Sequence, residues 1–192
     1  WKGRVVFLGD NVRNQNYEVA IFSDLASQPA TLEASAAADF YGLLPDHDTE
    51  IADAVQAYIQ AKLKGAPTFI SLPSHRWPTH WKGMRRPVCR LNLALYGHPQ
   101  SGAFWEEHAR DRLISENWAP IEGWPSCYFH KEFRAFMVLY VDDFKISGPS
   151  KYLKQAWETV MRHINIEPPS KLKAFLGCQM KPIWFIPPRR KE

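Results

Sequence analysis

Asp142 and Asp143 are the residues whose types and spacing point most directly to chemistry. The two carboxylates lie between two runs rich in strand-forming residues, 135–140 and 144–147, and Gly148-Pro149 ends the second run. This pattern predicts a β-hairpin with both aspartates in its connection. Neighbouring anions repel each other, and a divalent cation bound through their oxygens would offset that repulsion. The alternative is an ordinary hairpin tip whose acidic turn residues are solvated.

Asp53 could bring a third carboxylate to the same place. It follows a short predicted strand at 49–52 and precedes a predicted helix at 55–63, which ends at Lys64-Gly65. A strand end that faces a hairpin tip can share metal ions with it. Two Mg²⁺ ions about 3.5–4 Å apart clamp the attacking and leaving oxygens of an in-line phosphoryl displacement, and nucleotide polymerisation is one such reaction. The alternative role for Asp53 is the N-cap of the helix that follows it.

The segments that must position these aspartates are helices alternating with strands. Trp105, Ala109 and Leu113 recur at four-residue steps, which predicts a helix with one buried stripe. Together with the hairpin strands, the other predicted segments indicate an α+β fold. The predicted helices span 31–43, 101–117 and 151–163, and a further strand is expected near 68–72.

Composition sets limits on the class of protein but does not reveal a function. The formal net charge is only +4, and 45% of the residues are apolar, enough for the core of one or two compact units. The three cysteines show no Cys-x-x-Cys spacing, so we expect free thiols and no structural zinc. No apolar run approaches the ~20 residues that a membrane-spanning helix needs, so we expect no membrane partner and an intracellular protein.

Several blocks, in order along nearly the whole chain, resemble the reverse transcriptases of copia-type long-terminal-repeat retrotransposons. The blocks are Trp1-Lys2-Gly3-Arg4-Val5-Val6, the Asp53 segment, residues 89–105 with Leu95-Tyr96-Gly97, residues 124–129, the hairpin from Tyr140 to Asp143, and Phe175-Leu176-Gly177. The resemblance implies a polymerase right-hand fold with fingers, a palm built on an antiparallel sheet, and a largely missing thumb. The reverse transcriptase domain would cover 1–180, and 181–192 would be a truncated tail toward the thumb. The chain reads as a Pol polyprotein fragment.

The resemblance also implies an activity, RNA-directed DNA polymerisation, and residues that perform it. Asp53 and Asp142 would ligate two Mg²⁺ ions, with Asp143 completing the carboxylate set, and Mn²⁺ is an alternative metal. Tyr58 would exclude a ribose 2′-hydroxyl, although core packing is an equal alternative. The other residues expected near the nucleotide are Gln100, Lys2, Arg4 and Lys173, the last as a general acid toward pyrophosphate or simply as a solvated lysine.

Binding of template and primer would involve two further regions. The basic cluster of Lys82, Arg85, Arg86 and Arg90 could contact a phosphate backbone, although such clusters are often solvated surface. Leu176 and Gly177 match the primer-gripping turn. The implied partners are an RNA or DNA template with its primer, deoxynucleoside triphosphates, and the remaining Pol polyprotein with integrase and ribonuclease H. The implied location is the cytoplasm, a virus-like particle or the nucleus.

His98-Pro99 departs from the pattern of this family, which usually has Leu-Lys before Gln100. Gly102 stands where the family often has proline, so the role of Gln100 depends on the local backbone. These departures favour an alternative, a catalytically inactive relic that folds and at most binds nucleic acid. A third alternative is a metal-dependent phosphohydrolase that uses the same acidic residues.

Overall fold

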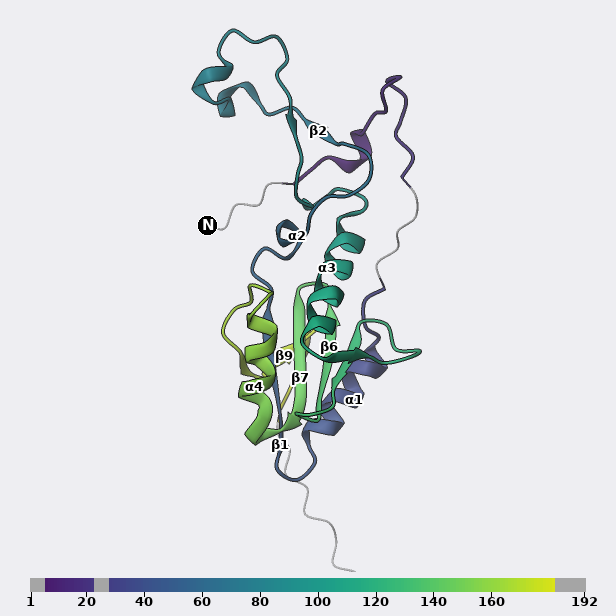
Figure 1. The fold of residues 1–192 in the computed structure, drawn as a ribbon, viewed down its shortest axis with the longest axis vertical. Helices are drawn as coiled ribbons and strands as arrows, with labels where there is room; N and C mark the ends of the chain where they lie inside the picture. Colours follow the sequence, from purple (N-terminus) through teal and green to yellow (C-terminus); the bar gives the residue numbers. More distant parts are fainter. Residues whose placement is uncertain (1–5, 23–27, 182–192) are drawn as a thin grey trace, which may run out of the picture.

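The protein is described by a computed structural model that covers residues 6–22 and 28–181. A six-stranded sheet forms its centre, in the order β4-β5-β6-β7-β1-β8, and every pair of neighbouring strands is antiparallel (Figure 1). The fold is therefore mixed α and β. The strands of this sheet are β1 (His47–Asp53), β4 (Trp118–Pro120), β5 (Cys127–His130), β6 (Ala135–Tyr140), β7 (Asp143–Pro149) and β8 (Ser170–Lys171).

Three helices of three or more turns cover the sheet, close to the predicted ranges. They are α1 (Leu32–Gly42), α3 (Ser101–Ser115) and α4 (Ser150–Met161). Thr31 caps α1, because its hydroxyl accepts a hydrogen bond from the backbone N–H of Ala34. In α3 the expected stripe of Trp105, Ala109 and Leu113 is at most 1% exposed, so that prediction is confirmed.

The two faces of the sheet are packed by different helices. Side chains alternate along β7, so Phe144 and Ile146 enter the larger core with α3 and α4. Lys145 and Ser147 point to the opposite face, where α1 lies. The larger core also holds Trp105, Trp118 and Trp157, while the α1 side has a smaller cluster around Ala34, Ala38 and Val138.

Some predicted segments differ from the structure. Asp143 was expected in the hairpin connection, but it is the first residue of β7 and pairs with Tyr140. The helix predicted at 55–63 is only the four-residue α2 (Ala57–Gln60), because Gln56 is left-handed before it and Ala61 is extended after it. The strand predicted at 49–52 corresponds to the longer β1 (His47–Asp53). The strand predicted near 68–72 is only the two-residue β2 (Phe69–Ile70).

Two small hairpins lie outside the main sheet. β2 pairs with β3 (Cys89–Arg90), and the segment between them extends away from the sheet and carries two short 3₁₀ helices (Figure 1). β9 (Ala174–Phe175) pairs with β10 (Cys178–Gln179) across a turn at Leu176-Gly177, as expected from the sequence. Another 3₁₀ helix covers Gly9–Asn11. No described helix is long and apolar enough to cross a membrane.

Candidate active site

The strand pairing brings together the three carboxylates singled out from the sequence. Asp53, at the end of β1, lies directly opposite Asp143, at the start of β7. The backbone N–H of Ala54 donates to the carbonyl of Asp142 at 2.7 Å, which holds the hairpin tip against the end of β1. On its other side, the carbonyl of Asp53 accepts from the N–H of Glu167 at 2.8 Å. The acidic site is thus built from segments about ninety residues apart in the sequence.

Charge repulsion is strong at this site. The pKa of Asp143 is raised to about 6, first by burial and then by the neighbouring carboxylates of Asp142 and Asp53. A side-chain hydrogen bond with Asp53 also favours the protonated form of Asp143. Asp53 is exposed, whereas Asp142 and Asp143 are half-buried, so solvent reaches the cluster from the Asp53 side. Anions gathered in this way are stabilised by a nearby cation.

The carboxylates fit a hard divalent metal in ligand type, although their side chains are not arranged around one. Mg²⁺ binds carboxylate oxygens together with several waters and substrate phosphates, so it does not need a complete protein cage. Among residues 6–22 and 28–181, no group of three or more His, Cys, Asp or Glu side chains is arranged as a metal site. Side-chain rotation of the three aspartates would therefore accompany any binding of metal.

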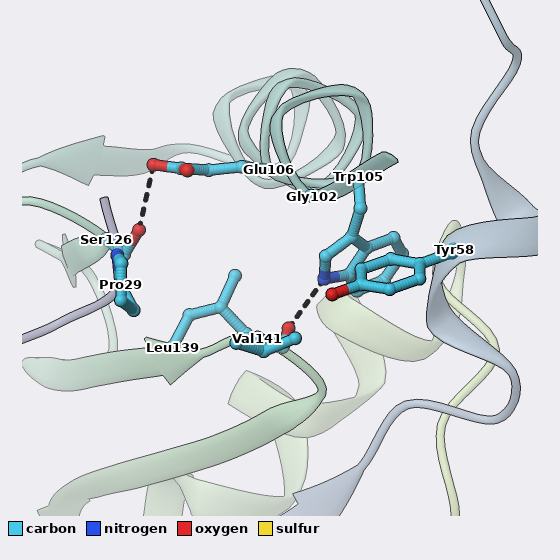
Figure 2. Close-up of a pocket in the computed structure, with 8 residues that line it drawn as sticks. All are labelled: Pro29, Tyr58, Gly102, Trp105, Glu106, Ser126, Leu139 and Val141. Carbon is cyan, nitrogen blue, oxygen red and sulfur yellow. Dashed lines mark hydrogen bonds between the residues drawn. The ribbon is translucent and has the colours of Figure 1, made fainter. Parts of the chain in front are cut away.

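The hairpin tip beside the carboxylates has an unusual backbone. Val141 and Asp142 form a two-residue connection, and Val141 has a φ of +55°. A β-branched residue is strained in this left-handed region, where a hairpin of this kind normally uses glycine. The indole Nε1 of Trp105 donates a hydrogen bond of 2.5 Å to the carbonyl of Val141 (Figure 2). This bond from α3 helps to hold the strained tip in place.

A pocket adjoins the hairpin tip on the α3 side. In Figure 2 the ring of Tyr58, from α2, lies beside the indole of Trp105, and both face the tip. Tyr58 also packs on Tyr96, with 4.5 Å between the ring centroids. At the other end of the pocket, Glu106 accepts hydrogen bonds from the Ser126 hydroxyl and the Gln28 backbone N–H. The lining residues are Pro29, Tyr58, Gly102, Trp105, Glu106, Ser126, Leu139 and Val141.

Tyr58 was singled out from the sequence, whereas the part played by α3 was not. Trp105 was expected only as a core residue, and Glu106 was not singled out. Trp105 could have been noticed because a buried indole needs an acceptor for its N–H, and hairpin connections offer free carbonyls. Glu106 carried no comparable signal, since its partners lie 20 and 78 residues away along the chain.

The other predicted residues are spread over a wider area. Gln100 is half-buried at the N-terminus of α3. Lys173 is exposed beside β9, and Leu176 and Gly177 form the turn of the β9–β10 hairpin, both with positive φ. Lys2 and Arg4 lie outside the described residues. The four basic residues predicted to bind nucleic acid lie on or beside the excursion between β2 and β3 and are all exposed, namely Lys82, Arg85, Arg86 and Arg90.

His98, the departure from the family pattern, is a structural residue. It is 5% exposed, and its ring contacts the rings of Phe7 and Phe22. Its Nδ1 accepts a hydrogen bond from the backbone N–H of Gln100 at 3.2 Å. Burial lowers the pKa of His98, in keeping with a neutral ring that can accept this bond. The histidine therefore shapes the backbone on which Gln100 sits.

Comparison with known proteins gives the chain a family context. No protein-family model matches it. It is 32% identical over 145 residues, 74% of its length, to the truncated transposon Ty1-A Gag-Pol polyprotein of Saccharomyces cerevisiae, of which the chain covers 11%. It is 36% identical over 98 residues, half of its length, to the transposon Ty1-BL Gag-Pol polyprotein of the same yeast, of which it covers 5%. The chain thus spans about a tenth or less of the length of these relatives, and it is similar to one part of the Gag-Pol polyproteins of these yeast transposons.

Proposed function

We propose that this chain is the fingers and palm of a reverse transcriptase, which adds deoxynucleotides to a primer 3′-hydroxyl on an RNA or DNA template. The observation that carries the proposal is the pairing of Asp53 with Asp143 beside Asp142. Three carboxylates from distant segments meet at one end of an antiparallel sheet, and the hairpin tip that carries Asp142 also lines a pocket through Val141. The similarity to transposon Gag-Pol polyproteins supports a reaction that belongs to retrotransposon replication.

Asp53 and Asp142 are the residues that would hold two Mg²⁺ ions, with Asp143 more peripheral, and Mn²⁺ would suit the same oxygens. Bound there, the ions would make the primer 3′-hydroxyl easier to deprotonate and would neutralise charge on the departing pyrophosphate. The raised pKa of Asp143 supports this role, because the site repels a further negative charge unless cations are present. The strained turn at Val141, held by Trp105, fixes where the Asp142 carboxylate is presented.

The pocket is the expected place for the incoming nucleotide. The Tyr58 ring forms one wall next to the hairpin tip, so it would lie under the sugar and exclude a 2′-hydroxyl. Gln100 precedes the first turn of α3, and Gly102 in that turn lines the pocket without a side chain. Lys2, Arg4 and Lys173 would meet the triphosphate, Lys173 as a general acid toward pyrophosphate.

Template and primer would bind outside the sheet on exposed basic and turn segments. Lys82, Arg85, Arg86 and Arg90 lie on or next to the excursion between β2 and β3, which is free to follow a phosphate backbone (Figure 1). The Leu176-Gly177 turn would contact the primer. The other partners would be integrase and ribonuclease H regions of the same polyprotein, in the cytoplasm, a virus-like particle or the nucleus.

Primer extension tests the proposal directly. The chain is incubated with a primed RNA template, deoxynucleotides and Mg²⁺, beside Asp142→Asn, Asp111→Asn and a version extended through its native downstream sequence. Asp111 is an exposed carboxylate on α3, so its variant controls for the loss of one negative charge. We expect extension by the parent chains and Asp111→Asn only. Extension that survives Asp142→Asn would refute the two-metal mechanism.

A non-catalytic relic is the second candidate, and the buried His98 is the observation that favours it. His98-Pro99 takes the place of an apolar residue and a lysine in the resembling family, and His98 packs inward on Phe7. A relic would give a folded chain that binds primed template but extends no primer in any version, including the extended one. Cleavage of nucleic acid without deoxynucleotides would instead support a phosphohydrolase.

A further inference from the structure

Lys145 is a fully buried lysine that lies two residues after Asp143 in β7. Its relative exposure is 0%, and residues two apart on a strand face the same side, so Lys145 shares a face with Asp143. A buried ammonium is unfavourable unless it is paired and hydrogen-bonded. Its presence next to the candidate active site therefore needs a physical reason.

The contacts of Lys145 join three segments of the chain. Its Nζ donates hydrogen bonds to Asp39 Oδ1 at 2.6 Å and to Ser35 Oγ at 2.8 Å, both on α1. The same Nζ lies 4.2 Å from the centroid of the Phe175 ring, at the end of β9. A cation placed over an aromatic face is attracted by the ring. Lys145 thus connects the central sheet, α1 and the β9–β10 hairpin.

An apolar side chain at this position would be expected to give similar or greater stability, because burying an ion pair costs desolvation. The ion pair instead specifies one arrangement of these segments. The hydrogen bonds to α1 hold the Lys145 ammonium in place, and the ammonium holds the Phe175 ring in place. Phe175 is 5% exposed and directly precedes Leu176 and Gly177, which have φ values of +50° and +77°. The place of this turn therefore follows from the place of the Phe175 ring.

We propose that Lys145 is a positioning residue that holds the Leu176-Gly177 turn at a fixed distance from Asp143, so that the turn seats the sugar-phosphate backbone of a primer strand. The inference rests on the proposed polymerase function. Lys145 touches neither primer nor nucleotide, because its side chain is enclosed by α1, β7 and β9. Asp39 and Ser35 act with it by holding the ammonium.

We call the contact of Lys145 with Phe175, Ser35 and Asp39 the clamp. Two variants, Phe175→Leu and a double variant at Lys145 and Asp39, separate the effect of the clamp from an effect on general stability. Phe175→Leu keeps an apolar side chain under the sheet but removes the aromatic face, and Phe175→Tyr restores that face. The double variant Lys145→Met with Asp39→Asn removes the ammonium without leaving a charged partner behind. Lys154→Met, an exposed lysine on α4, is the matched control for the loss of one positive charge.

Amide hydrogen exchange gives a measurement that does not depend on activity. The N–H of Met180 donates to the carbonyl of Lys173 at 2.9 Å, and Phe175 pairs with Cys178, so these amides report formation of the hairpin. An isolated two-stranded hairpin is marginally stable, so loss of its docking should open it and expose these amides. We expect Phe175→Leu and the double variant to speed their exchange by about tenfold, with β6 amides unchanged and Phe175→Tyr close to the parent. Unchanged exchange in both variants would overturn the clamp.

Primer binding tests the second half of the proposal. Fluorescence anisotropy with a labelled primer–template duplex should show a Kd raised about tenfold in Phe175→Leu and the double variant, but not in Lys154→Met. In extension assays the KM for duplex should rise while the KM for deoxynucleotide stays constant. A looser hairpin with unchanged duplex affinity would overturn the positioning role. A third outcome separates the two proposals. If the variants show faster amide exchange in the hairpin and weaker duplex binding, but the parent chain extends no primer, the clamp is supported and the proposed polymerase function is contradicted.

Discussion

Asp53 and Asp143 face each other across the β1–β7 ladder, and the pKa of Asp143 is raised to about 6. The first cause is burial, followed by the negative charges of Asp142 and Asp53. A candidate active site of this kind weakens the fold in the absence of metal, because each carboxylate destabilises the others. The relationship gives two predictions, one for pH and one for metal.

The free energy of unfolding should rise as the pH falls from 7 toward 4.5 in metal-free buffer. The folded-state pKa of Asp143 lies above its ordinary value of 3.8, so the folded chain binds the proton more tightly than the unfolded chain. The destabilisation of the fold by the charged Asp143 carboxylate is fully present above pH 6 and disappears below about pH 4. Asp143→Asn should remove it, raising the free energy of unfolding at pH 7 by about 1–2 kcal/mol, a figure reduced for solvent screening.

Urea denaturation of both proteins in the presence of a chelator, at pH 7 and at pH 4.5, measures this difference. Asp111→Asn is the control, since that carboxylate is exposed on α3. We expect the parent and the control to gain stability on acidification by more than Asp143→Asn does. An equal pH dependence in all three proteins would contradict the assignment of the raised pKa to Asp143.

Mg²⁺ should stabilise the parent chain by binding the folded state alone. At a concentration 100 times the Kd, the gain would be about 2.7 kcal/mol. Asp142→Asn and Asp53→Asn should lose most of this gain, because each removes one charged ligand. Thermal unfolding across a Mg²⁺ titration provides the measurement, with Asp111→Asn again as the control. A rise in Tm that is equal in all four proteins would mean that the ion binds elsewhere.

The local parts of this site could be predicted from the sequence, but its long-range contacts could not. β6 is a continuous run of strand-forming residues and α3 carries an apolar stripe at four-residue steps, so both were predicted within two residues of their bounds. Asp53 was expected near the hairpin tip as a strand end, and the resemblance supported this, but its pairing with Asp143 was not predicted because no local pattern encodes the register of β1 with β7. β4 and β5 were missed because they are only three and four residues long and end at Pro120 and His130, which leaves too short an apolar run to predict a strand.

Lys145 shows a different limit of sequence analysis. In the run 144–147, apolar and polar residues alternate, which normally indicates a strand with one solvated face. That face is covered by α1, where Ser35 and Asp39 satisfy the ammonium. The partners lie over 100 residues away along the chain, so the burial of Lys145 depends on a tertiary contact.

The buried ion pair of Lys145 with Asp39 should be far more sensitive to substitution than the exposed pair of Lys171 with Asp48. Removing one partner leaves the Asp39 carboxylate without its cation, so Lys145→Ala should lower the free energy of unfolding by about 3–5 kcal/mol. Lys171→Met should change it by less than about 1 kcal/mol. Equilibrium denaturation in urea measures both values, and similar losses in the two variants would contradict the prediction.

The hydrogen bond from Trp105 to Val141 should stabilise both the fold and the presentation of Asp142. Trp105→Phe keeps a large apolar ring but leaves the Val141 carbonyl without its donor, which should cost about 1–3 kcal/mol. Val141→Asn should be neutral or stabilising, because asparagine tolerates positive φ better than a β-branched residue. Denaturation measures both effects. Destabilisation by Val141→Asn would show that the valine side chain contributes more than its backbone strain costs.

Tyr58 has two competing roles, and a single comparison separates them. As a wall of the pocket beside Val141, its ring would clash with a ribose 2′-hydroxyl, whereas as a packing residue it would only support Tyr96 and the core. In the first case, Tyr58→Val should raise kcat/KM for ribonucleotides relative to deoxynucleotides by about tenfold or more. If Tyr58 is a packing residue, kcat/KM should fall for ribonucleotides and deoxynucleotides together, and Tm should drop. Steady-state extension with matched nucleotide pairs gives the ratio, and Tyr152→Val on α4 controls for loss of a tyrosine ring away from the pocket. An unchanged ratio with lower stability would assign Tyr58 to packing and leave sugar discrimination to another wall of the pocket.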